Sequence, residues 1–319
     1  DEFIEVPEEE MNLQPVLNQC TPDIAWFMSV GMRSWGISLA NLRWAPLQAM
    51  SFGHPASSFS SEMDMAFVTT RVFGGPGVVN ENMLILESEI GNVAEAHKDL
   101  KLPPPPVLDD SVVSIAVPCN TMKINLGFMT ALKEIERLSA KPIRFTFFPN
   151  EYGVGHLSTE KRLRSFFPTA VVARRTGYEA YLNMLNQHHL ALSPFPFGNA
   201  TSTIDCMVLG LPVISLIGAE PHSRSDYDIL ASLGLAEYCV ADSVKNYVHG
   251  VVRYINEPGL LEELRAMVAS KQFMDLHQQN ENEFSDEMCR ALNWAYANQN
   301  EVRGPKGLVF EGAGRWVEQ

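Results

Sequence analysis

Residues Ser193 to Leu216 read SPFPFGNATSTIDCMVLGLPVISL and give the clearest indication of how this chain folds. It follows the short apolar run 190–192, and its order is strand end, polar turn, helix, Gly-Leu-Pro turn and strand. Asn199, Thr201 and Ser202 are residue types that cap helices, so we predict a helix that starts near Thr203.

A helix that begins in this way exposes unpaired backbone N–H groups and the positive end of its dipole. Asp205 then lies one short step inside the helix. Together these features suit an anionic ligand that also carries a sugar hydroxyl. An ordinary capped helix in an α/β sheet has the same spacing, so the spacing alone leaves both interpretations open.

Strands and helices alternate along the chain after residue 111, which indicates a doubly wound parallel sheet with ligands at the carboxyl ends of its strands. The predicted strands are 112–117, 143–148, 170–172, 190–192 and 213–216. The predicted helices are 126–138, 159–166, 178–185 and 203–209, with others near 225–233, 243–256 and 258–270.

The earlier part of the chain offers four short strands, at 23–30, 45–50, 66–69 and 83–86. Four consecutive prolines at 103–106 favour a stiff connector, so we place a domain boundary at about 101–111; a surface loop within one domain is the alternative. The predicted domains are a partial N-terminal one at 1–105, a C-terminal one at 106–283, and a helix and tail at 284–319 that return to the first. The first domain has too few strands for a complete doubly wound sheet, so either it is abbreviated or the chain is a piece of a longer protein.

Composition excludes several classes of protein. The 319 residues, 46% of them hydrophobic, suffice for two α/β domains, and no apolar run approaches the roughly 20 residues that span a bilayer. Five dispersed cysteines without a Cys-x-x-Cys pair argue against a disulfide framework or a zinc site and favour the cytoplasm. A net charge of −14 argues against nucleic-acid binding.

The Gly-x-Gly-x-x-Gly and P-loop signatures are absent, and no Asp-x-Asp follows a strand to hold a metal.

Three other clusters follow predicted strands or turns. Lys123 leaves the strand 112–117 and could neutralise a diphosphate, or it is a solvated lysine at a helix start. Gly53 permits close backbone approach and His54 could donate a hydrogen bond or shuttle a proton, or this turn is structural. Tyr178 could recognise a planar base, or it is a core residue.

These motifs occur together in one known family. The segments APLQA (45–49), GHPA (53–56), TMKIN (121–125), PFPFGN (194–199), Asp205 and GAE (218–220) resemble the bacterial cytoplasmic N-glycosyltransferases that modify adhesins. The same order of motifs is similar, more distantly, to the catalytic region of the O-linked N-acetylglucosamine transferases. The resemblance covers roughly residues 35–270.

The resemblance implies a GT-B fold, in which two doubly wound Rossmann-like domains face a cleft that holds a UDP-hexose donor. It also implies inverting transfer to a polypeptide such as an adhesin, with no metal and no cofactor. By the family pattern, Lys123 contacts the donor diphosphate, Thr201 and Ser202 with Asn199 form the phosphate-binding turn, and Asp205 holds the ribose. Donor contacts are also implied for Asn120, Thr121 and Tyr178, and His54 with Gly53 would line the cleft, so Lys123 and His54 are the candidate catalytic residues.

The chain departs from this pattern at one place, because Asn199-Ala200-Thr201 replaces the usual Asn-Thr-Asn. The resulting hypothesis is transfer of a hexose, with glucose expected, from a UDP-sugar to asparagine. Two alternatives remain open: O-linked transfer to serine or threonine, and a non-catalytic module that binds nucleotide sugars.

Overall fold

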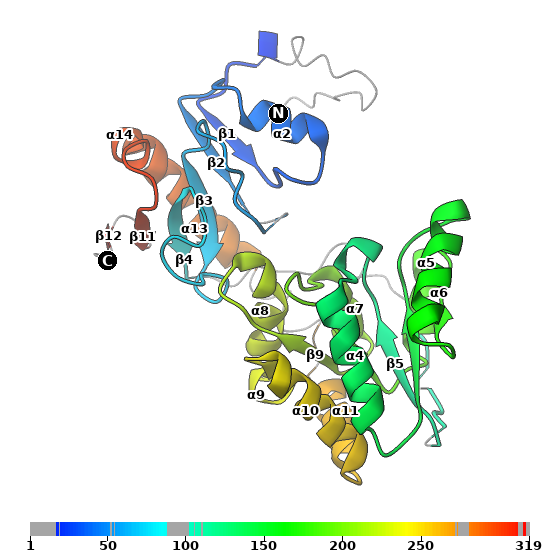
Figure 1. The fold of residues 1–319 in the computed structure, drawn as a ribbon. Helices are drawn as coiled ribbons and strands as arrows, with labels where there is room; N and C mark the ends of the chain where they lie inside the picture. Colours follow the sequence, from blue (N-terminus) through cyan, green and yellow to red (C-terminus); the bar gives the residue numbers. More distant parts are fainter. Residues whose placement is uncertain are drawn as a thin grey trace. The chain divides into compact units, whose positions relative to one another are not determined.

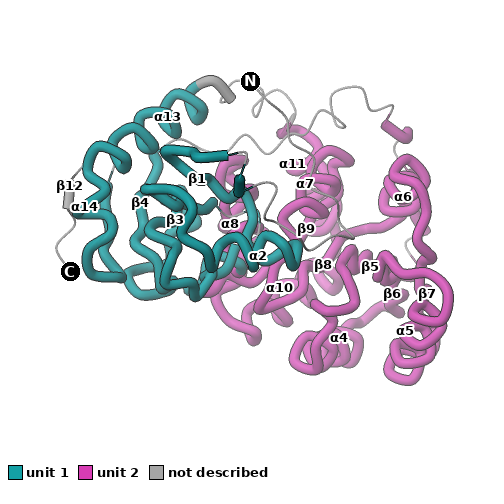
Figure 2. The backbone as a smooth tube through the Cα atoms, turned by 90° about the horizontal axis from the view of Figure 1, so that it is seen from above, with its two compact units in different colours: residues 1–90, 219–222, 280–319 teal, residues 91–218, 223–279 magenta. Residues whose placement is uncertain are grey.

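The computed structural model describes residues 17, 18, 20–51, 53, 55–87, 102–104, 106–109, 111–271, 273, 281–311, 315 and 316; for 281, 282, 315 and 316 it describes the backbone alone. Contacts between Cα atoms divide the chain into two compact units, drawn in teal and magenta in Figure 2. Unit 1 comprises residues 1–90, 219–222 and 280–319, and unit 2 comprises residues 91–218 and 223–279.

Unit 2 is built on a sheet of six parallel strands in the order β10-β9-β8-β5-β6-β7. The strands are β5 (Val113–Val117), β6 (Ile143–Phe147), β7 (Val171–Val172), β8 (Leu190–Leu192), β9 (Val213–Leu216) and β10 (Val240–Ala241). The strand order reverses at β5 and β8, which are neighbours in the sheet although β6 and β7 lie between them in the sequence (Figure 2). Such a reversal of strand order is where open α/β sheets bind ligands.

The helices of unit 2 connect these strands (Figure 1), and their apolar faces cover the sheet. They are α4 (Leu126–Leu138), α5 (Gly153–Phe166), α6 (Tyr178–Leu185), α7 (Thr201–Val208), α8 (Ser225–Ser232), α9 (Ala236–Cys239), α10 (Val244–Asn256) and α11 (Leu260–Ala269), with a 3₁₀ turn at Thr121–Lys123. On α4 the residues Phe128, Leu132 and Ile135 repeat at helical spacing and are fully buried, because this stripe packs on the sheet and against α10.

Unit 1 has its own six-stranded sheet, in the order β1-β2-β3-β4-β11-β12. Its strands are β1 (Ile24–Phe27), β2 (Leu47–Met50), β3 (Met65–Thr69), β4 (Asn82–Leu86), β11 (Val309–Glu311) and β12 (Arg315–Trp316); its helices are α2 (Ser34–Ala40), α13 (Glu281–Ala297) and α14 (Gln299–Val302). All pairs are parallel except β11 with β12.

The tail of the chain joins the first sheet through strand pairing. Val309, Phe310 and Glu311 of β11 pair with Met83, Leu84 and Ile85 of β4. The buried side chain of Asn82 supports this pairing, since it donates to Val302 O at 2.6 Å and accepts from Leu308 N at 2.8 Å. Helix α13 covers one face of this sheet, where Met288, Ala291 and Ala295 join the core of β2, β3 and β4.

The predicted parallel α/β pattern is confirmed in unit 2, and α4, α6, β8 and β9 have the predicted bounds. Helix α5 begins at Gly153 rather than near residue 159. The prediction missed the start of this helix because the sequence there has no amphipathic pattern: Gly153 has φ +60°, and the apolar Val154 and Leu157 are exposed. Helix α13 begins at 281 rather than 287, and α2, α9, α14, β10, β11 and β12 were not predicted. Residues 101, 105 and 110 of the predicted connector lie outside the described residues.

We expect Leu132→Ala to lower the free energy of unfolding of unit 2 by about 2–5 kcal/mol, because the side chain is fully buried and its loss leaves a cavity. Urea titration monitored by circular dichroism measures the change. Leu126→Ala on the same helix is the matched control: Leu126 is 70% exposed, so its loss should change stability by about 0.5 kcal/mol or less. Equal effects of the two substitutions would contradict the described packing of α4.

Candidate functional site

Two turns meet at the carboxyl edge of the sheet of unit 2 because β5 and β8 pair in parallel. Ile115 and Ala116 pair with Leu190 and Ala191, so the segments that follow the two strands leave the same edge. Lys123 Nζ donates to Gly198 O at 2.5 Å, and Asn125 Nδ2 donates to Phe195 O at 2.6 Å. The segment after β5 is therefore tied to the segment after β8 by two side chains.

Lys123 ends the 3₁₀ turn, and α4 begins three residues later. The idea of a lysine at the start of this helix is therefore wrong: Asn125 caps α4, accepting from Phe128 N at 3.0 Å. The ammonium lies 4.7 Å from the centre of the Phe197 ring. Burial lowers the pKa of Lys123, while Asp226 and Cys119 oppose this shift. Since an ammonium has three donors and Gly198 accepts from one, Lys123 can also donate to a ligand.

The start of α7 differs from the prediction. The helix begins at Thr201, two residues earlier than expected, and the residue before it is Ala200, which makes no side-chain cap. Asn199, Thr201 and Ser202 are therefore not the caps that the sequence suggested. Ala200 has φ +51° and ψ −92°, a backbone conformation that L-residues rarely adopt, so other contacts must hold this turn in place.

Asp226, near the start of α8, supplies those contacts and was missed by the sequence analysis. Its carboxylate accepts from the amides of Asn199 (3.0 and 3.2 Å to the two oxygens) and Ala200 (2.8 Å). It also accepts from the hydroxyls of Ser193 (2.5 Å) and Thr203 (2.7 Å). No local pattern could have identified Asp226, because it lies more than 20 residues beyond the turn and reaches it only through the packing of α7 and α8.

Asp205 and Tyr178 form a second polar pair at the site. The phenol of Tyr178 at the start of α6 donates to Asp205 Oδ1 at 2.6 Å. Burial raises the pKa of Tyr178, and its hydrogen bond with the Asp205 carboxylate raises it further. The ring of Tyr178 also stacks on Tyr181, with the ring centres 6.2 Å apart. Tyr178 is therefore neither a simple core residue nor fully exposed: it orients Asp205.

The remaining predicted site residues lie in unit 2, in unit 1 or outside the described residues. In unit 2, Asn120 is exposed just before the 3₁₀ turn, Thr121 is half-buried, Thr201 is exposed and Ser202 half-buried, while Asn199 is buried. In unit 1, Gly53 donates its amide to Met28 O at 2.9 Å, and a Cβ there would lie 2.5 Å from the same oxygen. His54 lies outside the described residues.

This arrangement in unit 2 can hold an anion next to a hydroxyl group. The amides of Thr201 and Ser202 occupy the first turn of α7, where a helix has no internal acceptors, and the Lys123 ammonium lies against the preceding turn. The Asp205 carboxylate, buried inside the same helix, can accept from a hydroxyl. Among the residues that the structure describes, no group of three or more His, Cys, Asp or Glu side chains is placed to hold a metal ion.

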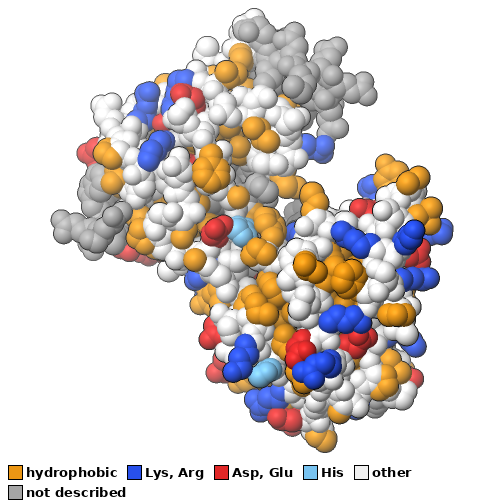
Figure 3. All heavy atoms as spheres, viewed as in Figure 1, with side chains coloured by type: hydrophobic (Ala, Val, Ile, Leu, Met, Phe, Trp, Pro, Cys, Tyr) orange, Lys and Arg blue, Asp and Glu red, His pale blue; other side chains and the backbone are white. Residues whose placement is uncertain are grey.

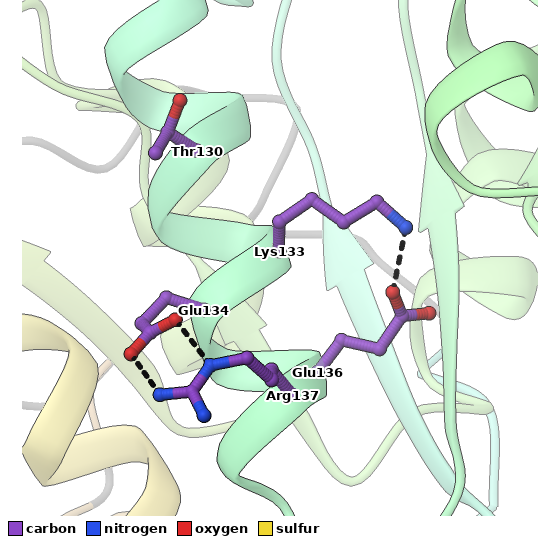
Figure 4. A pocket seen from close by; sticks show the side chains of 5 residues that line it. All are labelled: Thr130, Lys133, Glu134, Glu136 and Arg137. Atoms are coloured by element: carbon purple, nitrogen blue, oxygen red, sulfur yellow. Dashed lines mark hydrogen bonds and ion pairs between the residues drawn. The ribbon is translucent and has the colours of Figure 1, made fainter.

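A pocket of about 570 Å³ on α4 lies outside this site (Figure 4). It is lined by Thr130, Lys133, Glu134, Glu136 and Arg137. These side chains pair along the helix, with 2.8 Å between Lys133 and Glu136 and 2.6 Å between Arg137 and Glu134. Figure 3 shows acidic and basic side chains side by side over α4, so this pocket is a charge-balanced, solvated helix face.

Hydrophobic side chains gather at the other end of α4 instead. Met122 is 92% exposed and Leu126 is 70% exposed, and Figure 3 shows hydrophobic side chains over this end of the helix.

The described part of the chain contains no helix that is both long and apolar enough to cross a bilayer.

Comparison with solved structures shows the fold. A mutant of the Thermobaculum terrenum O-GlcNAc transferase matches with a TM-score of 0.72 and 16% identity, covering 93% of this chain and 56% of that one. S. aureus TarM in complex with UDP matches with a TM-score of 0.50 and 10% identity, covering 86% of this chain and 57% of that one. The prediction of an α/β fold of the GT-B type is confirmed.

No protein-family model matches the chain. Two curated relatives do, the UDP-glucose:protein N-beta-glucosyltransferases of Actinobacillus pleuropneumoniae serotypes 7 and 5b, each 31% identical over 265 residues. The match covers 79% of this chain and 42% of each relative, so the chain spans less than half the length of the relatives that it matches. The family resemblance seen in the motifs is thus confirmed by the alignment as a whole, and this chain belongs to the family of the bacterial protein N-glucosyltransferases.

Proposed function

We propose that the protein transfers glucose from UDP-glucose to asparagine side chains of a polypeptide. The observation that carries the proposal is the meeting of Lys123, the start of α7 and the Tyr178–Asp205 pair at one edge of the unit 2 sheet. A diphosphate suits the ammonium and the free amides, and a ribose hydroxyl suits Asp205. The relatives' names supply the sugar and the acceptor atom.

The proposed step is a single displacement. The amide nitrogen of asparagine forms a bond to C1 of glucose while the bond from C1 to the diphosphate oxygen breaks, and UDP leaves with the electron pair. The nitrogen loses one proton to a base or to water. Because UDP-glucose is α-linked and the relatives are named for a β-linked product, attack on the face opposite UDP accounts for the inversion.

Lys123 and the first turn of α7 would stabilise the departing UDP. Negative charge grows on the diphosphate as the bond to C1 breaks, and the ammonium and two amides are already oriented when it does. This supports a mechanism in which the protein itself, without a metal, offsets the charge. His54 stays a proposed contributor to the reaction, with Gly53 and Asn120 as further donor contacts.

We place the reaction in the cytoplasm with an adhesin as the acceptor, following the family resemblance. In support of a reducing compartment, Cys20, Cys119, Cys206, Cys239 and Cys289 are all free thiols. Cys206 and Cys119 are buried, and burial raises the pKa of Cys119 to about 12, so these thiols are inert.

Lys123→Ala should lower the turnover of UDP-glucose about 10²- to 10³-fold, because one oriented charged donor on the leaving group is lost. The assay follows glucose transfer to an Asn-x-Ser/Thr peptide, and fragmentation by mass spectrometry locates the modified atom. Lys133→Ala is the matched control, since Lys133 pairs with Glu136 on the charged face of α4. Wild-type turnover by Lys123→Ala would refute leaving-group stabilisation, and sugar found on serine or threonine would establish O-linked transfer instead.

Asp205→Asn should weaken UDP binding about tenfold, because a hydrogen bond from a ribose hydroxyl to a charged acceptor is lost. Calorimetry with UDP and its 2′-deoxy and 3′-deoxy forms locates the contact. The wild type should bind one deoxy form about tenfold less tightly than UDP, and Asp205→Asn should lose this discrimination. Tyr178→Phe should show a smaller loss in the same direction. If both deoxy forms bind the wild type as tightly as UDP, Asp205 does not hold the ribose.

A further inference from the structure

We propose that Asp226 is a positioning residue for the donor diphosphate: its carboxylate fixes the 199–203 turn so that the Thr201 and Ser202 amides and Lys123 face the same anion. The inference rests on the proposed function, because the anion in question is the UDP diphosphate. Asp226 itself does not touch the donor, since its carboxylate is buried behind the turn and only 3% of the residue is exposed.

Each oxygen of the Asp226 carboxylate accepts hydrogen bonds from a different pair of donors in or next to the turn. Oδ1 accepts from the Ala200 amide at 2.8 Å and the Thr203 hydroxyl at 2.7 Å. Oδ2 accepts from the Ser193 hydroxyl at 2.5 Å and the Asn199 amide at 3.0 Å. Only a carboxylate offers acceptors in both positions, because one end of an asparagine amide would present N–H groups to the same donors.

These bonds decide which amides of the turn can reach a ligand. The N–H groups of Asn199 and Ala200 point to Asp226, and the amide of Thr203 donates to Ala200 O at 2.9 Å. The amides left for an anion are those of Thr201 and Ser202, at the first two positions of α7. The positive φ of Ala200 is what separates the two sets, since it reverses the direction of the backbone between them.

Other side chains bind the carbonyl groups of residues 193–198, which lead into this turn. Tyr247 of α10 donates to Ser193 O at 3.0 Å, Asn125 donates to Phe195 O, and Lys123 donates to Gly198 O. The carbonyls of residues 193–198 thus accept from Lys123 of the 3₁₀ turn, from the Asn125 cap of α4 and from Tyr247 of α10, while the amides of Asn199 and Ala200 donate to Asp226. A turn held on both sides is preorganised, so an arriving diphosphate does not have to order it.

The negative charge of Asp226 also acts on Lys123. Burial lowers the pKa of Lys123, and the Asp226 carboxylate opposes that shift by stabilising the ammonium form. The thiols and phenols near this region stay neutral as the pH rises: burial raises the pKa of Cys119 to about 12 and raises the pKa values of Tyr178, Tyr181, Cys206 and Tyr247 above their usual range. Lys123, whose pKa burial lowers, therefore loses its proton before they do.

The test is calorimetric measurement of UDP affinity from pH 6 to pH 10 with the wild type and Asp226→Asn. The ammonium form of Lys123 binds UDP, so wild-type affinity should fall as pH rises through the pKa of Lys123. Asp226→Asn removes a charge that favours the ammonium, so the pKa falls further and affinity should be lost at a lower pH. At pH 7 we expect binding to weaken about tenfold.

Matched variants separate positioning from simple loss of packing. Asp242→Asn makes the same chemical change at the exposed start of α10, where Asp242 accepts from Asn246 at 2.6 Å, and should leave UDP binding unchanged. Thr203→Val removes one donor to Asp226 but keeps its charge, so it should weaken binding only about two- to fivefold with no shift in the pH dependence. Ser193→Ala should behave like Thr203→Val.

The outcomes distinguish this inference from the proposed function. If the wild type binds no UDP, the proposed function fails and the inference fails with it. If the wild type binds UDP but Asp226→Asn binds equally well with the same pH dependence, the inference alone is overturned. A loss of affinity without a pH shift would support the positioning of the turn and overturn only the electrostatic effect of Asp226 on Lys123. Should Asp226→Asn not fold, unchanged UDP binding by both Thr203→Val and Ser193→Ala would still refute the inference.

Discussion

The parallel pairing of β5 with β8 is the constraint on which the site depends. These strands are separated by more than 70 residues in the sequence, yet their pairing brings the turns after them to one edge of the sheet. Lys123 and Asn125 can bind the carbonyls of the second turn only because the first turn emerges beside it. A shift of this register by one residue would turn every side chain of β8 to the other face and would displace the two turns relative to each other.

The second turn is irregular, and side chains from other elements bind several of its backbone groups. Its amides would be unsatisfied without Asp226 of α8, and its carbonyls bind Lys123, Asn125 and Tyr247. A buried backbone group without a partner is unfavourable by about 1–3 kcal/mol, so these side chains together stabilise a conformation that the turn would not adopt alone. The same contacts leave the first amides of α7 without a partner in the turn, which is the physical basis for the proposed anion binding.

The candidate site has a local positive potential, although the chain as a whole carries a negative net charge. The net charge is −14, so long-range attraction does not draw a diphosphate to this protein. One half-buried ammonium and one helix terminus supply the local positive potential instead, and both lie where water is partly excluded and charges interact strongly.

The sequence alone determined the order of the strands β5 to β9 and of the longer helices of unit 2, although not the short α9 and β10, because buried parallel strands and amphipathic helices have distinct apolar periods. It also singled out Lys123, Thr201, Ser202 and Asp205, because these polar types follow strand ends. Only the tertiary structure revealed that Asp226, not the local polar residues, holds the start of α7, and that Tyr178 donates to Asp205. The pairing of β11 with β4 is of the same kind, since it joins residues more than 220 positions apart. Local patterns report the backbone conformation that a segment prefers, whereas contacts between distant segments arise only when the sheets bring them together.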